Sequence, residues 1–212
     1  HELRLEHVEA WSHYDEVSSQ PFAVLSELST KTRAAWGDVS TAKRELVAVP
    51  SERVDALTGL RSGQALLERA SKINMAASGT VRCLVTVDLS NLRLFNEWYG
   101  VEAGNRLLAE IGGLLADLEE RGGILAGYWG QDDFCLYLPF DRVLIDDVYG
   151  RMRRVVARHD DSPGFSPSFG VYPVDPRQPV TIDDYSKALF ANKQSKGDFK
   201  NRVSFFEPVA YA

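Results

Sequence analysis

Ile124-Leu-Ala-Gly-Tyr-Trp-Gly-Gln-Asp-Asp-Phe-Cys-Leu-Tyr-Leu138 contains two short β-rich runs that are joined by a tight polar turn. The runs are residues 124–129 and 134–138, and the turn between them carries Asp132 and Asp133. Two runs at this separation are typical of a β-hairpin. A hairpin in the middle of the chain indicates that at least part of the sheet is antiparallel.

Helical and strand patterns alternate on both sides of this hairpin. Apolar residues from Leu107 to Leu118 recur at helical spacing, and Gly122-Gly123 ends that run. A β-rich run at 81–87 leads to Asp88 and is a candidate buried strand. The remaining expected elements are a helix after Ser62, a helix at 142–159, a strand at 168–172, a helix opened by a capping box at Thr181 and Asp184, and a strand at 202–206. This order predicts an α/β (α+β) fold, in which helices cover the faces of a mixed or antiparallel sheet.

Residues 1–50 have a different pattern. Apolar residues recur at helical spacing on both sides of Pro21, and a further helical stretch covers 30–47. These helices either pack on the main domain or connect it to an upstream sensor, and periodicity does not separate the two alternatives. We therefore expect an N-terminal helical segment or linker at 1–50 and a second unit at 51–212. Because the chain begins at His1, we expect it to be part of a longer protein.

The composition is that of a globular protein, with 44% hydrophobic and 25% charged residues. The net charge of -6 argues against a general nucleic-acid-binding protein, because no broad basic surface can neutralise phosphates, but it allows a local pocket for one nucleotide. Cys83 and Cys135 lie inside β-rich runs, so we expect buried, reduced thiols rather than a disulfide. The sequence shows no membrane span or signal peptide, and we expect a cytoplasmic domain whose parent protein could be membrane-bound.

Two carboxylates are expected at one edge of the sheet. Asp88 ends a strand, and Asp132 lies on the turn of a hairpin that could pair beside that strand. Because Mg²⁺ takes one or two carboxylates together with phosphate oxygens and water, such a pair could hold Mg²⁺ on a triphosphate. The alternative is that both are ordinary solvated aspartates. These residues alone leave both interpretations open.

Five segments resemble, in order and at matching intervals, the motifs of the GGDEF family of nucleotide-cyclase domains. The family motifs are DxLTGLxNR, DxDxFKxxNDxYG, GG[DE]EF, SxGV and ALYxAK. The matching segments are Asp55-Ala-Leu-Thr-Gly-Leu60, Asp88-Leu-Ser-Asn-Leu-Arg-Leu-Phe-Asn-Glu-Trp-Tyr-Gly100, Gly130-Gln-Asp-Asp-Phe134, Phe169-Gly170-Val171 and Ala188-Leu-Phe-Ala-Asn-Lys193. The resemblance implies a central, mostly antiparallel sheet flanked by helices, similar to the adenylyl-cyclase and polymerase palm. It also implies a diguanylate cyclase, which joins two GTP molecules into cyclic di-GMP in a homodimer.

The resemblance assigns roles to individual residues as well. Asp88, the backbone carbonyl of Leu89 and Asp132 would bind the metal, which would be Mg²⁺ or alternatively Mn²⁺. Asp132 and Asp133, the acidic residues of the signature, would act in catalysis. The residues implied in nucleotide binding are Asn96 and Asn105 at guanine, Arg93 and Lys193 at the phosphates, and Gly130 and Gln131 in the signature loop. The alternative is that the two cations are solvated surface charges and that Asn96 is a turn residue.

Three departures from the family motifs concern the nucleotide directly. Gln131 replaces the second signature glycine, which lets the backbone pass close to the nucleotide and supplies an angle that glycine reaches easily. A displacement of about 1 Å at such a point can cost about 100-fold in rate. Asp133 replaces glutamate and shortens the reach of the carboxylate. Asn105 replaces an aspartate that reads guanine, and an amide offers that base one acceptor and an unwanted donor.

Other departures lie around the site. Ser90 replaces a second aspartate, and Tyr128 replaces the arginine before the signature. The inhibitory site of the family is an RxxD motif just upstream of the signature. Here the corresponding residues are Arg121-Gly-Gly-Ile124, without the aspartate, so we expect the feedback binding of cyclic di-GMP to be weakened.

Three functions are compatible with this sequence. The first is a degenerate GGDEF domain that binds Mg²⁺–GTP with weak or no turnover and regulates a partner, or a neighbouring sensor or phosphodiesterase domain. The second is an active diguanylate cyclase, which is supported by the carboxylates kept at all three acidic positions. The third is a dimerisation module without a ligand. The altered signature favours the first.

Overall fold

The computed structural model describes residues 54–76, 79–195 and 202–208. The helices expected within 1–50, and the expected boundary at residue 50, lie outside these described residues and stay predictions.

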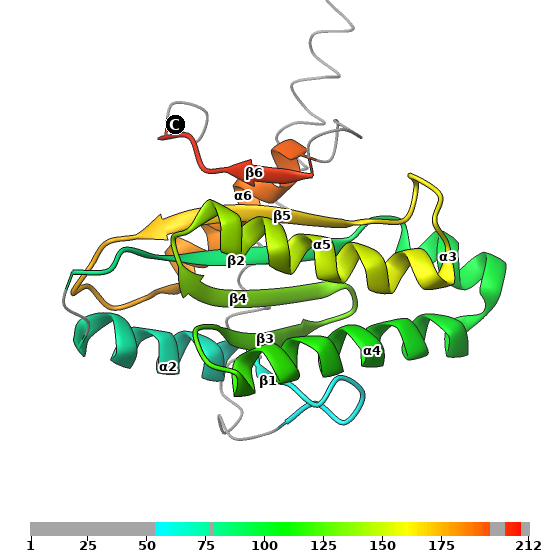
Figure 1. Cartoon of the computed structure of the whole chain (residues 1–212), viewed down its shortest axis with the longest axis horizontal. Coiled ribbons are helices and arrows are strands. Elements are labelled where there is room, and N and C mark those ends of the chain that lie inside the picture. Colours follow the sequence, from blue (N-terminus) through cyan, green and yellow to red (C-terminus); the bar gives the residue numbers. More distant parts are fainter. Residues whose placement is uncertain (1–53, 77–78, 196–201, 209–212) are drawn as a thin grey trace, which may run out of the picture. The chain divides into compact units, whose positions relative to one another are not determined.

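Helices and strands alternate along the described part of the chain (Figure 1). In chain order they are β1 (Arg61–Ser62), α2 (Gly63–Ala76), β2 (Arg82–Leu89), α3 (Leu92–Tyr99), α4 (Val101–Glu120), β3 (Leu125–Gly130), β4 (Asp133–Pro139), α5 (Arg142–His159), β5 (Pro167–Val174), α6 (Ile182–Ser195) and β6 (Val203–Phe205). The strands form one six-stranded sheet in the order β1-β3-β4-β2-β5-β6. The inner pairs are antiparallel, whereas the short outer strands β1 and β6 pair in parallel. The expected mostly antiparallel sheet flanked by helices is confirmed.

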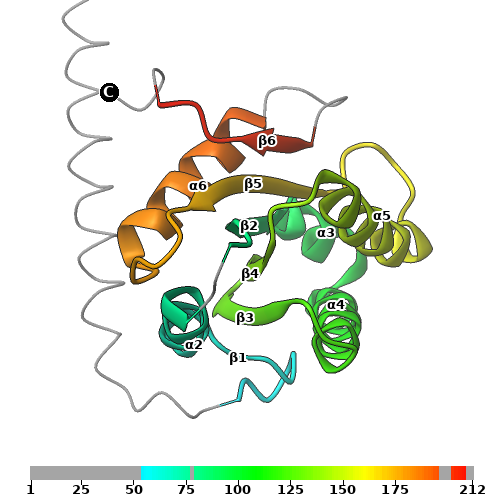
Figure 2. The same ribbon diagram turned by 60° about the vertical axis from the view of Figure 1, so that its left-hand side comes forward.

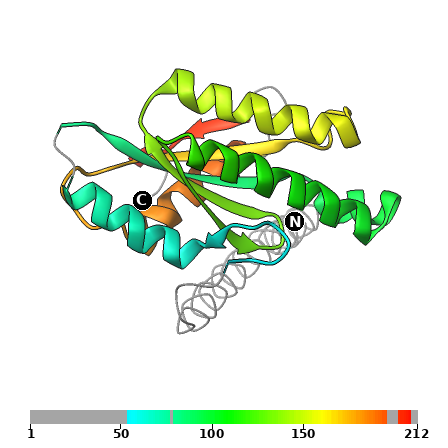
Figure 3. The same cartoon turned by 60° about the horizontal axis from the view of Figure 1, so that its bottom comes forward.

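The sheet is covered on both faces (Figure 2). Because side chains alternate along a strand, Val85 and Val87 of β2 face α3, α4 and α5, whereas Leu84 faces α2 and α6. Helices α4 and α5 run beside each other over the first of these faces (Figure 3). Strand β2 is buried from Cys83 to Leu89, which explains why its sequence is an almost unbroken apolar run.

The two cysteines are free thiols, as expected. Cys83 packs with the residues under α3, α4 and α5, and Cys135 packs with those under α2 and α6. The two sulfurs therefore lie on opposite faces of the sheet, and no disulfide can join them without breaking the strands. Burial raises the pKa of the Cys83 thiol to about 12, so the thiol stays protonated at neutral pH.

The strongest sequence patterns give accurate elements. The expected helix at 142–159 coincides with α5. The capping box before α6 is present, because the carboxylate of Asp184 accepts from the backbone N–H of Thr181 at 2.8 Å. Ser62 accepts from the N–H of Ala65 at 3.2 Å, which is the expected cap of α2.

The sequence analysis missed two short elements. Helix α3 has only eight residues and buries Leu92 and Phe95. Its N-cap, Asn91, has a φ of 60° and makes no side-chain cap, so the helix is short and no capping motif marks its start. Strand β1 has two residues, and a side chain holds it in place. Arg61 donates two hydrogen bonds of 2.6 Å to Glu119 of α4. No helix in the ranges 54–76, 79–195 and 202–208 is long and apolar enough to cross a bilayer.

Gly170 lets α6 approach β5 closely. A Cβ atom at this position would overlap the carbonyl oxygen of Ala188 and the backbone nitrogen of Asn192, both on α6. Because these are backbone atoms, they cannot rotate away. The helix that follows the SxGV segment can therefore pack here only against a glycine.

We predict that Gly170→Ala lowers the free energy of unfolding by about 3 kcal/mol, since the helix must move away from the strand. The measurement is urea denaturation followed by circular dichroism. Gly150→Ala is the matched control, because its Cβ would meet only Arg154, at 3.7 Å, inside α5. A helix gains about 1 kcal/mol from that change. Equal stability of the two variants would contradict the close contact.

Candidate functional site

Three carboxylates meet at the end of β2. Asp88, Asp132 and Asp133 each offer one oxygen, and these oxygens all lie within 4.8 Å of one another. Asp88 is 8% exposed, and Asp132 and Asp133 are half-buried. The antiparallel pairing of β2 with β4 sets Asp88 directly opposite Asp133, while Asp132 comes from the hairpin turn. The expected convergence of Asp88 and Asp132 is confirmed.

The chemistry of this cluster suits a hard divalent cation. Two unit negative charges 4 Å apart repel by about 1 kcal/mol in water and by more where water is partly excluded. A bound cation turns that repulsion into attraction, and carboxylate oxygens are the ligands that Mg²⁺ and Mn²⁺ prefer. The cluster can therefore hold such an ion, and its donor set does not distinguish between the two metals.

The carbonyl of Leu89 is directed toward the same place. Ser90 donates its backbone N–H to the carbonyl oxygen of Ser166, the residue just before β5, at 3.0 Å. In an antiparallel strand, successive residues direct their N–H and C=O groups to opposite neighbours. Leu89 therefore directs its carbonyl to the β4 side, where Asp132 and Asp133 lie. This orientation agrees with the ligand role that the sequence predicted.

The hairpin turn contains two residues with positive φ. Tyr128 pairs with Phe134 and Gly130 pairs with Asp133, so a β-bulge lies between Tyr128 and Gly130. The φ angles are 105° at Gly130 and 59° at Gln131. The second signature position thus has a left-handed backbone, which costs about 1–2 kcal/mol for a residue with a Cβ atom. This agrees with the expectation that the position requires an angle that glycine reaches easily.

Tyr128 braces this turn. Its hydroxyl donates to the carbonyl oxygen of Gln131 at 2.8 Å, and its ring lies 4.9 Å from that of Phe134. Burial, together with the negative charges of Asp55, Asp132 and Asp133, raises the pKa of Tyr128 to about 12. The hydroxyl therefore stays protonated and remains a donor at neutral pH. Sequence analysis noted Tyr128 only as a departure from the family arginine.

The buried side chain of Asn192 makes hydrogen bonds to the strands next to the acidic cluster. Asn192 of α6 donates its amide to the carbonyls of Thr86, at 3.1 Å, and Ser168, at 2.8 Å. The Ser168 hydroxyl lies 3.0 Å from Asn192 Oδ1 and 3.3 Å from the carbonyl of Asp88. These contacts tie α6 to β2 and β5 next to the first acidic residue. Asn192 was not expected to have a role. The available signal was an amide four residues after Ala188, on the buried face of the helix, where a polar group needs hydrogen-bond partners.

Asn96 lies on α3, with its side chain against Gly104 of α4, and is not a turn residue. Its side chain is half-buried against Gly104, where a Cβ atom would overlap its Oδ1. That Oδ1 is buried and accepts no hydrogen bond from any residue that the structure describes. A buried acceptor without a donor is unfavourable unless a ligand or water supplies one. Asn105 is exposed one residue beyond Gly104.

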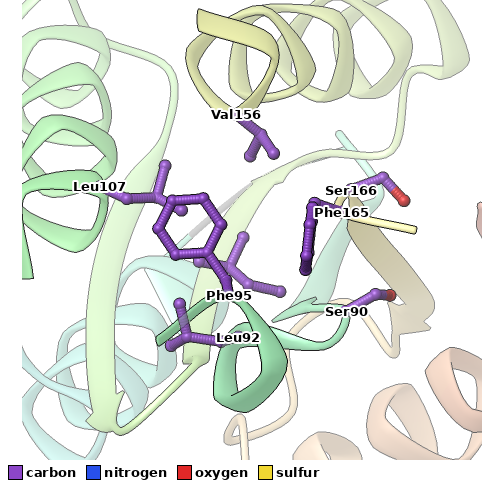
Figure 4. A pocket seen from close by; sticks show the side chains of 8 residues that line it. Ser90, Leu92, Phe95, Leu107, Val156, Phe165 and Ser166 are labelled. Carbon is purple, nitrogen blue, oxygen red and sulfur yellow. The ribbon is translucent and has the colours of Figure 1, made fainter. Parts of the chain in front are cut away.

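A small apolar hollow adjoins the end of β2 (Figure 4). Its volume is about 10 Å³, which is close to the minimum for one water molecule. It is lined by Leu89, Ser90, Leu92, Phe95, Leu107, Val156, Phe165 and Ser166. A purine base is many times larger, so this hollow belongs to the packing of α3 and does not accommodate a nucleotide.

Comparison with known proteins identifies the family. The family model for the diguanylate cyclase GGDEF domain matches residues 52–195. The chain belongs to the GGDEF family. Diguanylate cyclase DgcP of Escherichia coli (strain K12) is 28% identical over 126 residues, which are 58% of this chain and 36% of DgcP. The chain thus spans about a third of that relative.

Solved GGDEF structures share the fold. The GGDEF domain of DgcB from Caulobacter crescentus, in complex with c-di-GMP, has a TM-score of 0.59 at 20% identity, covering 74% of this chain and 98% of that one. A sensory box/GGDEF family protein from Caulobacter crescentus CB15 has a TM-score of 0.53 at 25% identity, covering 66% and 97%. The sheet order and helix placement described above are therefore those of a GGDEF domain.

The two expected phosphate-binding cations lie on the surface of this GGDEF domain. The side chain of Arg93 is 94% exposed and forms an ion pair of 3.2 Å with Glu97 on the same helix. Lys193 is exposed in the last turn of α6, next to the buried Asn192. The structure does not bring Arg93 to the acidic cluster, and a role for either cation at phosphate stays a prediction.

Ser90 is hydrogen-bonded to a buried arginine. Ser90, which replaces the second aspartate, accepts a hydrogen bond of 3.0 Å from Arg202. Arg202 is 7% exposed and donates also to the carbonyl of Pro163 at 3.3 Å. Sequence analysis placed Arg202 only at the start of the last strand, because nothing local links it to a residue more than a hundred positions away.

Of the two residues that correspond to the inhibitory motif of the family, Arg121 is exposed and Ile124 is buried. Arg121 follows α4 and is exposed, whereas Ile124, at the place of the aspartate, is 6% exposed in the main apolar cluster. An aspartate at this position would have to be buried among apolar side chains or turn outward. The weakened feedback site stays a prediction, and the burial of Ile124 agrees with it.

We predict that Gln131→Gly raises the free energy of unfolding by about 1 kcal/mol, because glycine removes the left-handed strain at this turn. The measurement is urea denaturation. Gln64→Gly, on α2, is the matched control and should lower stability by up to about 1 kcal/mol, because glycine is unfavourable in a helix. If Gln131→Gly destabilises the domain as much as Gln64→Gly does, position 131 is not strained.

Proposed function

We propose that this domain binds Mg²⁺–GTP, converts it to cyclic di-GMP weakly or not at all, and regulates a partner or a neighbouring domain. The observation that carries the proposal is the cluster of Asp88, Asp132 and Asp133, whose oxygens lie within 4.8 Å of one another. Asp88 and Asp132, with the carbonyl of Leu89, would hold the ion. When bound, Mg²⁺ neutralises phosphate charge and lowers the pKa of an attacking hydroxyl.

Asn96 supports the assignment of guanine as the base. Its Oδ1 is buried against Gly104 and accepts no hydrogen bond from the described residues, so a ligand N–H would satisfy it. Asn105, the exposed residue after Gly104 on α4, offers an amide where the family has a carboxylate. We therefore expect guanine to be bound less tightly and less selectively than in family members that keep the aspartate.

Weak turnover follows from the residues around the carboxylates. Gln131 has its side chain on a left-handed backbone at the point where the family needs glycine. Asp133 reaches one methylene less far than glutamate, so a catalytic carboxylate at this position is displaced. Each change acts on geometry, and displacements of about 1 Å cost about 100-fold. Together they favour binding over reaction.

An active diguanylate cyclase is the second candidate. One observation favours it: all three acidic positions keep a carboxylate, and the fold brings them together. Cyclic di-GMP requires two GTP molecules, so this function also requires a homodimer. The remaining alternative, a dimerisation module without a ligand, leaves the acidic cluster and the buried acceptor of Asn96 without a purpose.

The proposed regulatory role requires a partner. A regulatory GGDEF domain that does not turn over GTP would act through a partner or a neighbouring domain. We propose a sensor or a phosphodiesterase domain as the neighbour, and the cytoplasm as the compartment, because GTP is found there.

The test combines a binding and a turnover measurement on the same protein. Titration calorimetry with GTP and Mg²⁺ should show binding, and chromatography after prolonged incubation should show little or no cyclic di-GMP. Asp88→Asn should lower the affinity for Mg²⁺–GTP by at least about 10-fold, since a metal ligand is lost. Rapid product formation would overturn the regulatory proposal in favour of the cyclase. Absence of binding would leave the dimerisation module.

We predict that Gly104→Ala lowers the affinity for GTP by about 10-fold, because the new Cβ atom displaces the Asn96 amide without removing any polar group. The matched control is Gly113→Ala on the same helix, where a Cβ atom meets nothing within 4 Å. That variant should bind GTP normally. Both affinities are measured by the calorimetric titration, and equal affinities would contradict a guanine-binding role for Asn96.

A further inference from the structure

The turn that presents Asp132 is held by a side chain outside it. Gln131 has a φ of 59°, which a residue with a Cβ atom rarely adopts, and its carbonyl oxygen accepts a hydrogen bond from the hydroxyl of Tyr128 at 2.8 Å. This carbonyl belongs to the peptide group that joins Gln131 to Asp132. A bond to that oxygen therefore fixes the plane of the peptide from which Asp132 begins.

The Tyr128 ring is itself fixed. It stands on β3 in register with Phe134 of β4, and the two rings pack at 4.9 Å. The side chain is half-buried, so its hydroxyl has little freedom to leave the Gln131 carbonyl. The hydrogen bond from Tyr128 thus connects the paired strands of the hairpin to the left-handed residue in its turn.

The hydrogen bond from Tyr128 and the left-handed backbone at Gln131 act on the same peptide group. A left-handed residue that is not glycine tends to relax by rotating its flanking peptide groups, which would carry the Asp132 carboxylate away from Asp88. The Tyr128 hydroxyl opposes that rotation, because the rotation would break its 2.8 Å hydrogen bond to the Gln131 carbonyl. With glycine at position 131, the same backbone is unstrained and needs no brace.

We infer that Tyr128 is a positioning residue that keeps Asp132 in the acidic cluster, and that it compensates for the glutamine at position 131. The inference rests on the proposed function in so far as Asp132 binds a cation. It assigns to Tyr128 and Gln131 a joint role: the hydroxyl stabilises the turn that the glutamine strains.

The test is a double-mutant cycle read by metal affinity. Tyr128→Phe keeps the ring and removes only the hydroxyl. We expect its affinity for Mn²⁺, measured from the electron paramagnetic resonance signal of the free ion, to fall about three- to ten-fold. In Tyr128→Phe combined with Gln131→Gly, the affinity should return to within about two-fold of Gln131→Gly alone. Rescue by an unstrained turn is a result that general loss of stability does not produce.

Tyr99→Phe is the matched control. It also loses a hydroxyl that donates a hydrogen bond, in this case to the carboxylate of Asp160 at 2.7 Å, and Asp160 is not part of the acidic cluster. Its Mn²⁺ affinity should equal that of the unaltered chain. An unchanged affinity in Tyr128→Phe, or an equal fall with glutamine and with glycine at position 131, would overturn the inference.

A second readout separates this inference from the proposed function. If the unaltered chain binds no Mn²⁺, the proposed function fails, and ¹⁵N–¹H spectra of the metal-free protein decide the positioning role. Tyr128→Phe should then shift or split the amide signals of Asp132 and Asp133, and Gln131→Gly should remove that effect. Unchanged Asp132 and Asp133 signals in Tyr128→Phe would overturn the inference even though the protein is folded.

Discussion

The pairing of β2 with β4 is the constraint on which the rest of the structure depends. It sets Asp88 opposite Asp133, and both strands carry core side chains on their two faces. A shift of register by one residue would turn every one of those side chains to the wrong face. Apolar contacts spread over the whole sheet therefore keep close together three carboxylates that repel one another.

The sequence predicts those parts of the molecule that depend on local periodicity. The hairpin, the strand that leads to Asp88 and the helix at 142–159 each have a pattern of their own, so the convergence of Asp88 and Asp132 could be expected. The Asn192 amide and the Arg202 guanidinium could not, because their partners lie 24 or more residues away. Helix α3 was missed although Leu92, Phe95 and Tyr99 recur at helical spacing, because the helix has only eight residues and no side-chain cap.

The altered signature affects geometry more than charge. All three acidic positions keep a carboxylate, and the structure brings them together. The changes lie in the backbone angle at Gln131, in the length of Asp133 and in the groups that surround the cluster, such as Ser90 with its Arg202 partner. Family membership thus establishes the fold, whereas the surroundings of the site govern the chemistry.

The three carboxylates differ in how firmly they are held. Asp88 belongs to a strand that is bonded to neighbours on both sides, and Asp133 lies opposite it, whereas Asp132 sits on the turn between β3 and β4. Mg²⁺ demands nearly ideal octahedral distances, while larger divalent ions accept looser ligand sets. A cation at this site would have one ligand on a strand of the sheet, Asp88, and one on a turn, Asp132. The stiffness of the turn, more than the number of charges, would then set how sharply the site separates small ions from large ones.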